Sequence, residues 1–362
     1  MRFYFICLPP GPPENTPYHH EMLAIAEGLS ELGFEIAANI NYWQLSPDAA
    51  EYAIPEATTH DIDAYDVIIF SSDAYEFHAE YLLPTDLFKS SRRYKIVFVD
   101  QADGLITPAF RPEMRSADLV LKCHYNKYFD YPANFVPWQF GLTNRIIQSC
   151  SPVGFEEREQ VILSGFRVSH PIRTAVDDVL TRYAYNIYPK SAGTDGFECS
   201  LSSDLDTLFW AQTGRRHYPS FYKRLGVSLL CNASGGGGNK ILKSPLLSEK
   251  SILLRAVRRL ERQLEFLPLR SVHQFDSWRF WESLASGCCT LHIDFDKYGC
   301  TLPENPVNGI HYLGLDLENP EETISILQDR RRLREISNRG RAWANDSYSP
   351  QAVAKRLVKM LA

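Results

Sequence analysis

Short runs of apolar and β-branched residues alternate with amphipathic stretches along the first half of this chain. Five such runs have the length of buried strands and lie at residues 2–8, 34–40, 67–71, 95–99 and 119–123. Residues 18–32 instead carry apolar side chains at helical spacing, and Gly33 follows them as a helix-ending glycine does. This alternation predicts an open parallel sheet covered by helices, which is an α/β domain.

The same pattern begins again after a polar linker at residues 143–157. Residues 159–165 predict a buried strand that ends in glycine, and the sequence GFRVSHPIR then opens a helix. A stretch rich in Gly, Ser, Asp and Pro at residues 186–204 predicts a loop. Pro350 introduces a final amphipathic helix. The chain therefore predicts two α/β domains and one terminal helix.

Residues 276–294, with the sequence DSWRFWESLASGCCTLHID, predict a polar turn, a helix and a short buried strand. Ser277 occupies the N-cap position, where its hydroxyl can accept a hydrogen bond from the first turn. Arg279 and Glu282 lie three residues apart and share one helical face. One interpretation of these residues is an ordinary amphipathic helix with a surface ion pair. A helix N-terminus also suits a phosphate, and a carboxylate one turn further on suits sugar hydroxyls.

Composition narrows the class of protein. A length of 362 residues fits two domains, and 44% hydrophobic with 23% charged residues is typical of a globular chain. The net charge of −6 predicts no general attraction to nucleic acid. Eight cysteines without a C-x-x-C pair predict reduced core thiols in a cytosolic protein. No apolar stretch has the length of a secretory signal or a membrane span, and no zinc-ligand spacing occurs.

Polar residues follow several predicted strands, at the positions where open parallel sheets bind ligands. Asp100 and Asp103, in the sequence DQADG, follow the strand at residues 95–99, although Asp and Gly also form plain turns. His19 and His20 stand at the start of the first helix, either as surface residues or within reach of a phosphate. These residues are the candidates for chemistry in the first half.

Arg167 and Arg173 lie at the strand-to-helix junction that opens the second half, one in the loop and one on the helix. Two fixed cations at such a junction would neutralise a diphosphate leaving group. His170 lies between them. Two solvated surface arginines are the alternative interpretation.

Three further stretches have two interpretations each. The aromatic residues Tyr218, Phe221 and Tyr222 can stack on a nucleotide base or pack in the core, and we expect two of the three in the core. Four glycines at residues 235–238 lack the spacing of a P-loop, so we expect a flexible loop that orders on ligand binding. Residues 250–267 predict a basic helix, either on the protein surface or against an anionic membrane.

Residues 276–294 resemble the donor-binding segment of GT-B glycosyltransferases, in which a polar turn leads into a helix ending E-x-x-A-x-G and then a short strand. Ser277, Arg279 and Glu282 are similar to the exostosin-like and family-4-like branches. In those enzymes the glutamate matching Glu282 holds the ribose of a nucleotide-sugar. The family-4 pattern has a second glutamate eight residues earlier, where this chain has Gln274.

The resemblance implies a GT-B fold, with two Rossmann-like domains that face each other across a cleft. Residues 1–150 would form the acceptor domain and residues 158–347 the nucleotide-sugar donor domain, with helix 350–362 crossing back onto the first. The implied donor-binding residues are Glu282, Arg279, Ser277, Trp278, Tyr222 and Asp276. The implied catalytic residues are Arg167, Arg173, Asp103 and His170, with His19 and Asp100 on the acceptor side.

The implied activity is transfer of a hexose from a UDP-sugar to a glycan or lipid-linked acceptor, with retention and without a metal or other cofactor. Two alternatives stay open. A sugar-nucleotide epimerase would need acid and base residues in the cleft, and Gln274 would suit a non-catalytic nucleotide-sugar-binding subunit. We expect a cytoplasmic protein, with the helix at residues 250–267 as a candidate peripheral contact with the inner membrane face.

Overall fold

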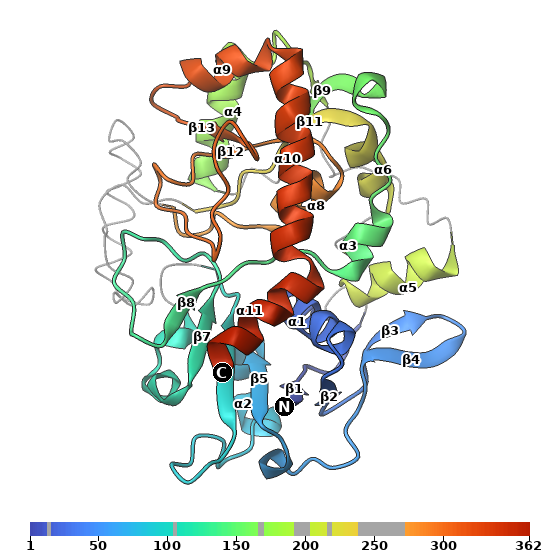
Figure 1. Ribbon diagram of the computed structural model, residues 1–362, viewed down its shortest axis with the longest axis vertical. Coiled ribbons are helices and arrows are strands. Elements are labelled where there is room, and N and C mark those ends of the chain that lie inside the picture. The colour runs from blue at the N-terminus through green and yellow to red at the C-terminus, as the bar shows by residue number, and fades with distance from the viewer. Residues whose placement is uncertain (13–15, 104–106, 166–169, 192–202, 216–218, 238–271) are drawn as a thin grey trace.

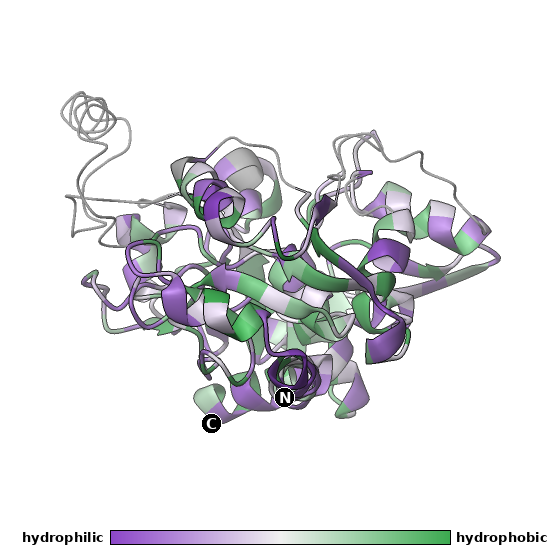
Figure 2. Ribbon diagram, turned by 90° about the horizontal axis from the view of Figure 1, so that it is seen from above, coloured by the Kyte–Doolittle hydropathy of each residue, from purple (hydrophilic) through white to green (hydrophobic). Residues whose placement is uncertain are grey.

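The computed structural model describes residues 1–12, 16–103, 107–165, 170–191, 203–215, 219–237 and 272–362. These residues form two parallel sheets, one in the lower and one in the upper part of Figure 1. In Figure 2 the strands inside the molecule are largely apolar, and hydrophilic residues lie on the outer helices. Arg167, Tyr218 and the helix expected at residues 250–267 lie outside the described residues.

The first sheet has six strands in the order β2-β1-β5-β6-β7-β8, and every neighbouring pair is parallel. The strands are β1 (Arg2–Ile6), β2 (Glu35–Ala38), β5 (Val67–Ser71), β6 (Lys95–Asp100), β7 (Leu119–Lys122) and β8 (Phe135–Pro137). Each run that the apolar pattern predicted as a strand is confirmed. The strand order reverses between β1 and β5, so the loops after these two strands diverge and leave a natural ligand position.

Helices cover both faces of this sheet, and one of them comes from the end of the chain. They include α1 (His20–Glu31), α2 (Ser72–Leu82) and the 3-10 helices η2 (Ile62–Ala64), η3 (Pro108–Phe110) and η4 (Pro112–Ser116). Helix α11 (Pro350–Leu361) packs along α1, where Gly28 lets the helix approach the backbone of Pro350 closely. The predicted return of the terminal helix to the first domain is therefore confirmed.

An antiparallel hairpin, β3 (Tyr42–Ser46) and β4 (Ala49–Ile54), extends from the first domain and was not predicted. It contacts α5 (Asp204–Gln212) of the second domain, because the backbone of Gln44 exchanges two hydrogen bonds with the Gln212 amide at 2.7 and 3.0 Å. Trp43 stacks on Phe209, with 5.5 Å between the ring centroids. This hairpin joins the two domains on one side.

The second sheet has five parallel strands in the order β10-β9-β11-β12-β13. The strands are β9 (Glu159–Leu163), β10 (Lys190–Ser191), β11 (Ser228–Asn232), β12 (Cys289–Ile293) and β13 (Leu313–Leu315). The helices include α4 (Pro171–Tyr183), α6 (Pro219–Val227), α8 (Trp278–Ala285), α9 (Glu321–Leu327) and α10 (Arg330–Tyr348). Here the order reverses between β9 and β11.

Helix α8 forms as its periodicity predicts. Phe280, Trp281 and Leu284 are buried in the core of the second domain, and Gly287 follows the helix with φ +65°. Ser277 stands at the N-cap position, but the expected cap is wrong, because the Ser277 hydroxyl accepts no hydrogen bond from the first turn. The helix is held by tertiary packing of its apolar face more than by its cap.

Two segments cross between the domains side by side. The first crossing leads into α3 (Asn144–Ser149) and the 3-10 helix η5 (Phe155–Glu157), and the second joins α10 to α11. The Leu142 N–H donates to the Tyr348 carbonyl at 3.0 Å, which ties the two crossings together. The seven cysteines within the described residues are free thiols. No helix within those residues is both long and apolar enough to cross a membrane.

Candidate active site

The carboxyl ends of the two sheets lead into one interface. Asn126, in the loop after β7, donates from its side-chain amide to the Val272 and Tyr298 carbonyls at 2.7 and 2.8 Å. The Lys127 N–H donates to the Gly299 carbonyl, in the loop after β12, at 2.8 Å. Loops that follow strands of both sheets therefore meet, as required for a site built from both domains.

On the second domain, α4 and the glycine segment after β11 are fitted together. The Arg173 Nε donates to the Gly235 carbonyl at 2.9 Å. A Cβ at Gly236 would lie 2.9 Å from the His170 ring, and the Gly236 N–H already donates to the Gln274 carbonyl at 2.5 Å. Only glycine permits this approach of backbone to ring. Arg173 and His170 are therefore brought to one place, and ordering of the glycine segment on ligand binding stays a prediction.

Arg279, in the first turn of α8, joins this group. Its guanidinium lies 5.6 Å from the centroid of the Phe221 ring. Burial, and then the nearby charge of Arg279, lower the pKa of Arg173. Two guanidinium groups near the N-termini of α4 and α8 create a positive site, and such a site suits a diphosphate.

Glu282 lies one turn further along α8, at the centre of a buried polar network. It is 2% exposed, and its carboxylate accepts a hydrogen bond from the Tyr222 hydroxyl at 2.9 Å. The same hydroxyl accepts from the Arg145 guanidinium at 3.0 Å. Arg145 also lies 5.6 Å from the centroid of the Tyr18 ring in the first domain. The network fixes the Glu282 carboxylate, whose contact with a ribose stays a prediction.

Arg145 was not predicted from the sequence. It lies in α3, within the stretch that we interpreted only as a polar linker, and is 4% exposed. Nothing about one arginine in a linker distinguishes it from a solvated residue. Phe221 and Tyr222 are 5% and 2% exposed, which confirms the core position expected for two of the three aromatic residues. Base stacking by Tyr222 would need a ring face that this packing covers.

Asp276 and Trp278 connect α8 to the first domain. The Asp276 carboxylate accepts from the Phe140 N–H at 2.8 Å and from the Trp281 indole N–H at 2.7 Å, while burial raises its pKa to about 7. The Trp278 ring lies 5.8 Å from Tyr18 and 6.0 Å from Phe140. Both residues fit the domains together at the start of α8, and direct contacts with a donor stay predictions.

Asp103 and His124 face this cation group from the first domain. Asp103 has an exposed carboxylate 3.7 Å from the Nε2 of His124, which is 3% exposed. The Asp103 charge also acts on His170 and Arg173 of the second domain. Three of the four expected catalytic residues therefore lie together, and the fourth, Arg167, is outside the described residues.

Asp100, His19 and His20 are buried. Asp100 is fully buried and pairs with the Lys122 ammonium at 3.1 Å. The Leu8 N–H donates to the His19 Nε2 at 3.0 Å, so the ring proton is on Nδ1, which lies 3.2 Å from the Ser71 hydroxyl. A surface position for the two histidines is therefore wrong, because both are fully buried. Acceptor contacts of His19 and Asp100 stay predictions.

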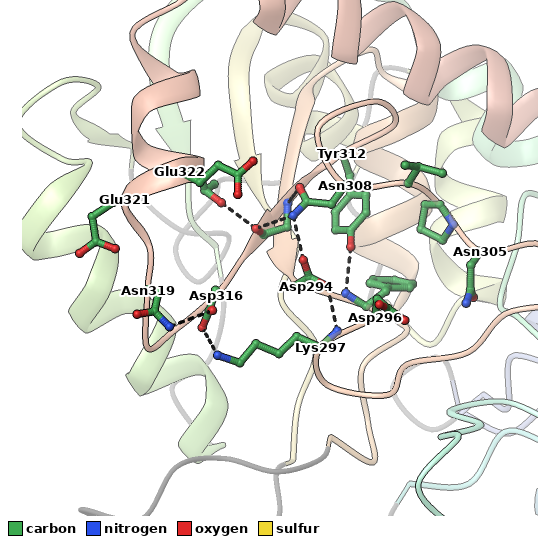
Figure 3. A pocket seen from close by; sticks show the side chains of 15 residues that line it. Asp294, Asp296, Lys297, Asn305, Asn308, Tyr312, Asp316, Asn319, Glu321 and Glu322 are labelled. Atoms are coloured by element: carbon green, nitrogen blue, oxygen red, sulfur yellow. Dashed lines mark hydrogen bonds and ion pairs between the residues drawn. The ribbon is translucent and has the colours of Figure 1, made fainter.

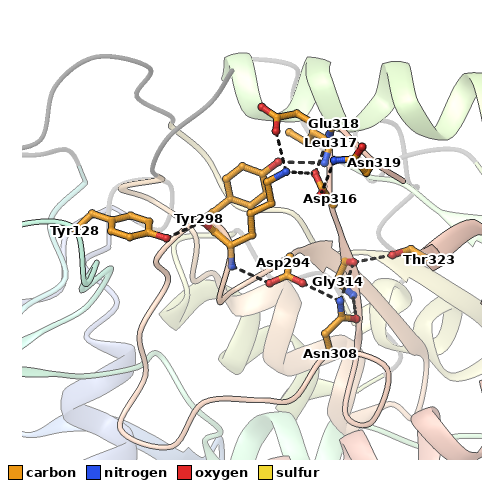
Figure 4. Close-up of polar contacts among 11 residues, drawn as sticks. Tyr128, Asp294, Tyr298, Asn308, Gly314, Asp316, Leu317, Glu318, Asn319 and Thr323 are labelled. Carbon is orange, nitrogen blue, oxygen red and sulfur yellow. Dashed lines mark hydrogen bonds and ion pairs between the residues drawn. The ribbon is translucent and has the colours of Figure 1, made fainter. Parts of the chain in front are cut away.

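A separate hollow of about 830 Å³ lies beyond β12 and β13 (Figure 3). Its carboxylates include Asp294, Asp316 and Glu322. Lys297 pairs with Asp316 and with Glu318, which lies outside the hollow. Asp294 also accepts from Asn308 at 2.8 Å (Figure 4). None of the predicted site residues lines this hollow, and its negative lining does not suit a diphosphate. Within the described ranges, no group of three or more His, Cys, Asp or Glu side chains is arranged to hold a metal ion.

Comparisons with known proteins identify the fold of this chain. No family model matches the sequence, and no curated protein matches it. An α-glucosyltransferase solved with UDP and a 13-mer DNA matches with a TM-score of 0.52 and 9% identity, over 99% of this chain and 98% of that chain. A glycosyltransferase from Rickettsia africae matches with a TM-score of 0.52 and 11% identity, over 99% and 96%. At these identities the likeness concerns the fold alone, and the fold of this chain is GT-B.

Proposed function

We propose that this protein is a glycosyltransferase that transfers a sugar from a nucleotide-diphosphate sugar to an acceptor hydroxyl. The observation that carries the proposal is the convergence of Arg173 and Arg279, from the first turns of α4 and α8, beside the glycine segment after β11. Two cations at two helix N-termini favour a diphosphate whose charge grows as the glycosidic bond breaks. A UDP-hexose is the donor that we expect.

In this proposal Glu282 binds the ribose hydroxyls, and Arg145 and Tyr222 hold its carboxylate in place. The donor C1–O bond breaks, and its electron pair passes to the diphosphate. The acceptor oxygen then bonds to C1 on the same face, and its proton passes to the departing phosphate oxygen. Retention follows in this scheme from bond formation on the face that the leaving group occupied. The scheme needs no metal, because guanidinium groups and helix termini balance the leaving charge.

The first domain would bind the acceptor. Asp103 of that domain and His170 of the second domain would lie near the sugar ring. We propose a glycan or lipid-linked acceptor and no nucleic acid, since the net charge of −6 opposes binding to a polyanion. The DNA in the matched α-glucosyltransferase structure concerns that protein. A cytoplasmic location, with residues 250–267 against a membrane, stays part of the proposal.

A panel of UDP-, GDP-, ADP- and dTDP-sugars would test the activity. The purified protein should release nucleoside diphosphate from one donor slowly in water, and faster with a mixture of neutral glycosides as acceptors. Mass spectrometry should find the lengthened glycoside. Release of an epimerised nucleotide-sugar would favour the epimerase, and binding without any turnover would favour the non-catalytic subunit. No binding of any donor would contradict the proposed function.

A further inference from the structure

Glu21, in the first turn of α1 (Figure 1), is a buried carboxyl without an obvious structural purpose. It is 1% exposed, and neither carboxylate oxygen forms a hydrogen bond with another residue in the described part of the chain. Its neighbours His19 and His20 are equally buried, yet both rings have hydrogen-bond partners. Its own backbone N–H acts on the carboxyl, but no other residue pairs with it, whereas buried polar groups normally have such partners.

The surroundings of Glu21 place it at the interface of the domains. Asp276, at the start of α8, and Asp73, in α2, both act electrostatically on its carboxyl. The carboxyl in turn acts on Cys123, at the end of β7. Phe140 lies between the start of α1 and β7, because its ring is 6.3 Å from His20 and 5.4 Å from His124. Glu21 therefore lies at the carboxyl edge of the first sheet, beside the second domain.

Other buried polar atoms at the same edge also lack hydrogen bonds within the described residues. They are the Ser72 hydroxyl after β5, the His124 Nδ1 after β7 and both amide atoms of Gln139 after β8. Each belongs to a residue that is 3% exposed or less. Ser72 and His124 are next in sequence to Asp73 and Cys123, which interact electrostatically with Glu21. Gln139 is next to Phe140, whose N–H donates to Asp276. Three strand ends and one helix thus contribute donors and acceptors to one edge.

We propose that Glu21, Ser72, His124 and Gln139 form a subsite for the hydroxyl groups of a neutral, sugar-like acceptor. The proposal rests on the proposed function and adds a substrate class to it. Mixed donors and acceptors suit a polyhydroxylated ring, in which each hydroxyl both donates and accepts. A phosphate or carboxylate at this subsite would have to lose its hydration among four buried residues, none of which is a cation, so the subsite selects an uncharged ring.

Burial raises the pKa of Glu21 well above its ordinary value, and the charges of Asp73 and Asp276 raise it further. This shift favours the protonated acid, which can donate one hydrogen bond and accept another. An amide has the same capacity, whereas alanine has neither. The Glu21→Gln variant should consequently keep acceptor recognition, and the Glu21→Ala variant should lose it.

The experiment compares Glu21→Ala, Glu21→Gln and the exposed control Glu51→Ala in transfer assays. We expect the acceptor KM of Glu21→Ala to rise on the order of tenfold or more, that of Glu21→Gln to stay within about threefold, and the control to match wild type. Calorimetry should give an affinity for UDP within about twofold of wild type in all three. An unchanged acceptor KM in Glu21→Ala, or an equal loss of UDP affinity, would overturn the subsite.

The stability of the variant supplies an independent measurement. Removing a buried carboxyl that pairs with no other residue should leave the melting temperature of Glu21→Ala equal or higher, whereas a structural role predicts a clear decrease.

The class of ligand that binds supplies a second measurement. Saturation-transfer NMR without donor should detect neutral free disaccharides or alkyl glycosides on wild type, and not the matching glycosyl phosphates. Preference for the alkyl series would indicate a lipid-linked source, and preference for free disaccharides a soluble glycan. Equal binding of the phosphates would overturn the proposal. Because this arm uses no donor, its result is separate from a failure of the glycosyltransferase activity.

Discussion

Replacing Tyr222 by Phe removes one oxygen atom from the centre of the Glu282 network. In the wild type this hydroxyl accepts from Arg145 at 3.0 Å and donates to Glu282 at 2.9 Å, and all three residues are at most 4% exposed. A phenylalanine ring at this position would leave a buried cation and a buried carboxylate without their shared partner. Losing a buried hydrogen-bond partner of charged groups costs roughly 1.5 to 3 kcal/mol.

This magnitude converts into two measurable changes. A domain of this size loses about 2 to 4 °C of melting temperature per kcal/mol, so the donor domain should melt roughly 3 to 12 °C lower. The affinity for UDP should fall on the order of tenfold, because Glu282 is no longer held in one orientation and tenfold corresponds to about 1.4 kcal/mol. Scanning calorimetry and titration calorimetry measure the two effects on the same sample.

The control is Tyr183→Phe, because Tyr183 is 42% exposed on α4. It should leave both quantities unchanged. A double-mutant cycle of Tyr222→Phe with Glu282→Gln should give a coupling energy of about 1 to 3 kcal/mol. If Tyr222→Phe melts within about 2 °C of wild type and binds UDP with unchanged affinity, the network does not position Glu282.

Three further predictions concern turnover, pH and the domain interface. Arg173→Ala should lower kcat on the order of a hundredfold with a small change in UDP affinity, and the control Arg182→Ala, at an exposed position, should match wild type. A kcat of Arg173→Ala within about threefold of wild type would show that Arg173 does not stabilise the leaving group. Burial raises the pKa of Glu27 to about 8 and that of Asp276 to about 7. The folded state therefore binds these protons more tightly than the unfolded chain, so the two carboxyls make the stability fall as the pH rises. Burial lowers the pKa of His19 and His292 to about 4, which acts in the opposite direction below about pH 6.5. Urea unfolding should therefore find the fall between about pH 6.5 and 8, and Glu27→Gln should flatten that slope. Asn126→Ala removes two hydrogen bonds between the domains and should enlarge the radius of gyration in small-angle scattering, an increase that UDP-sugar reverses if donor binding closes the domains.

The local pattern of apolar residues predicted the helices and strands, whereas contacts between distant parts of the chain determine most of the candidate site. The strands and helix α8 follow from periodicities over a few residues, and Gly33 and Gly287 have the positive φ that their positions suggested. The hairpin β3–β4 was missed because its residues carry no clear alternation, and its stability depends on α5 across the interface.

Side-chain environments were harder to predict than elements. A surface position was one of two interpretations of His19 and His20, and it is wrong, since a histidine pair at a helix start gives no sign of how deeply the helix is embedded. Arg145 and Glu21 were missed for the same reason, because an arginine in a linker and a glutamate in a first helical turn are ordinary in sequence. The role of Arg145 comes from burial and from a partner more than 70 residues away, Tyr222, and the proposed role of Glu21 comes from its burial.

The return of α11 to the first domain has a consequence for biosynthesis. Val353, Ala354, Leu357 and Leu361 belong to the same apolar core as Phe3 and Leu23. The first domain therefore cannot complete its core when its own strands leave the ribosome, and its α1 face stays uncovered until α11 has been synthesised. A chain without α11 should combine a complete donor domain with an aggregation-prone, protease-sensitive first domain, so folding of the half synthesised first depends on a helix synthesised after the second half.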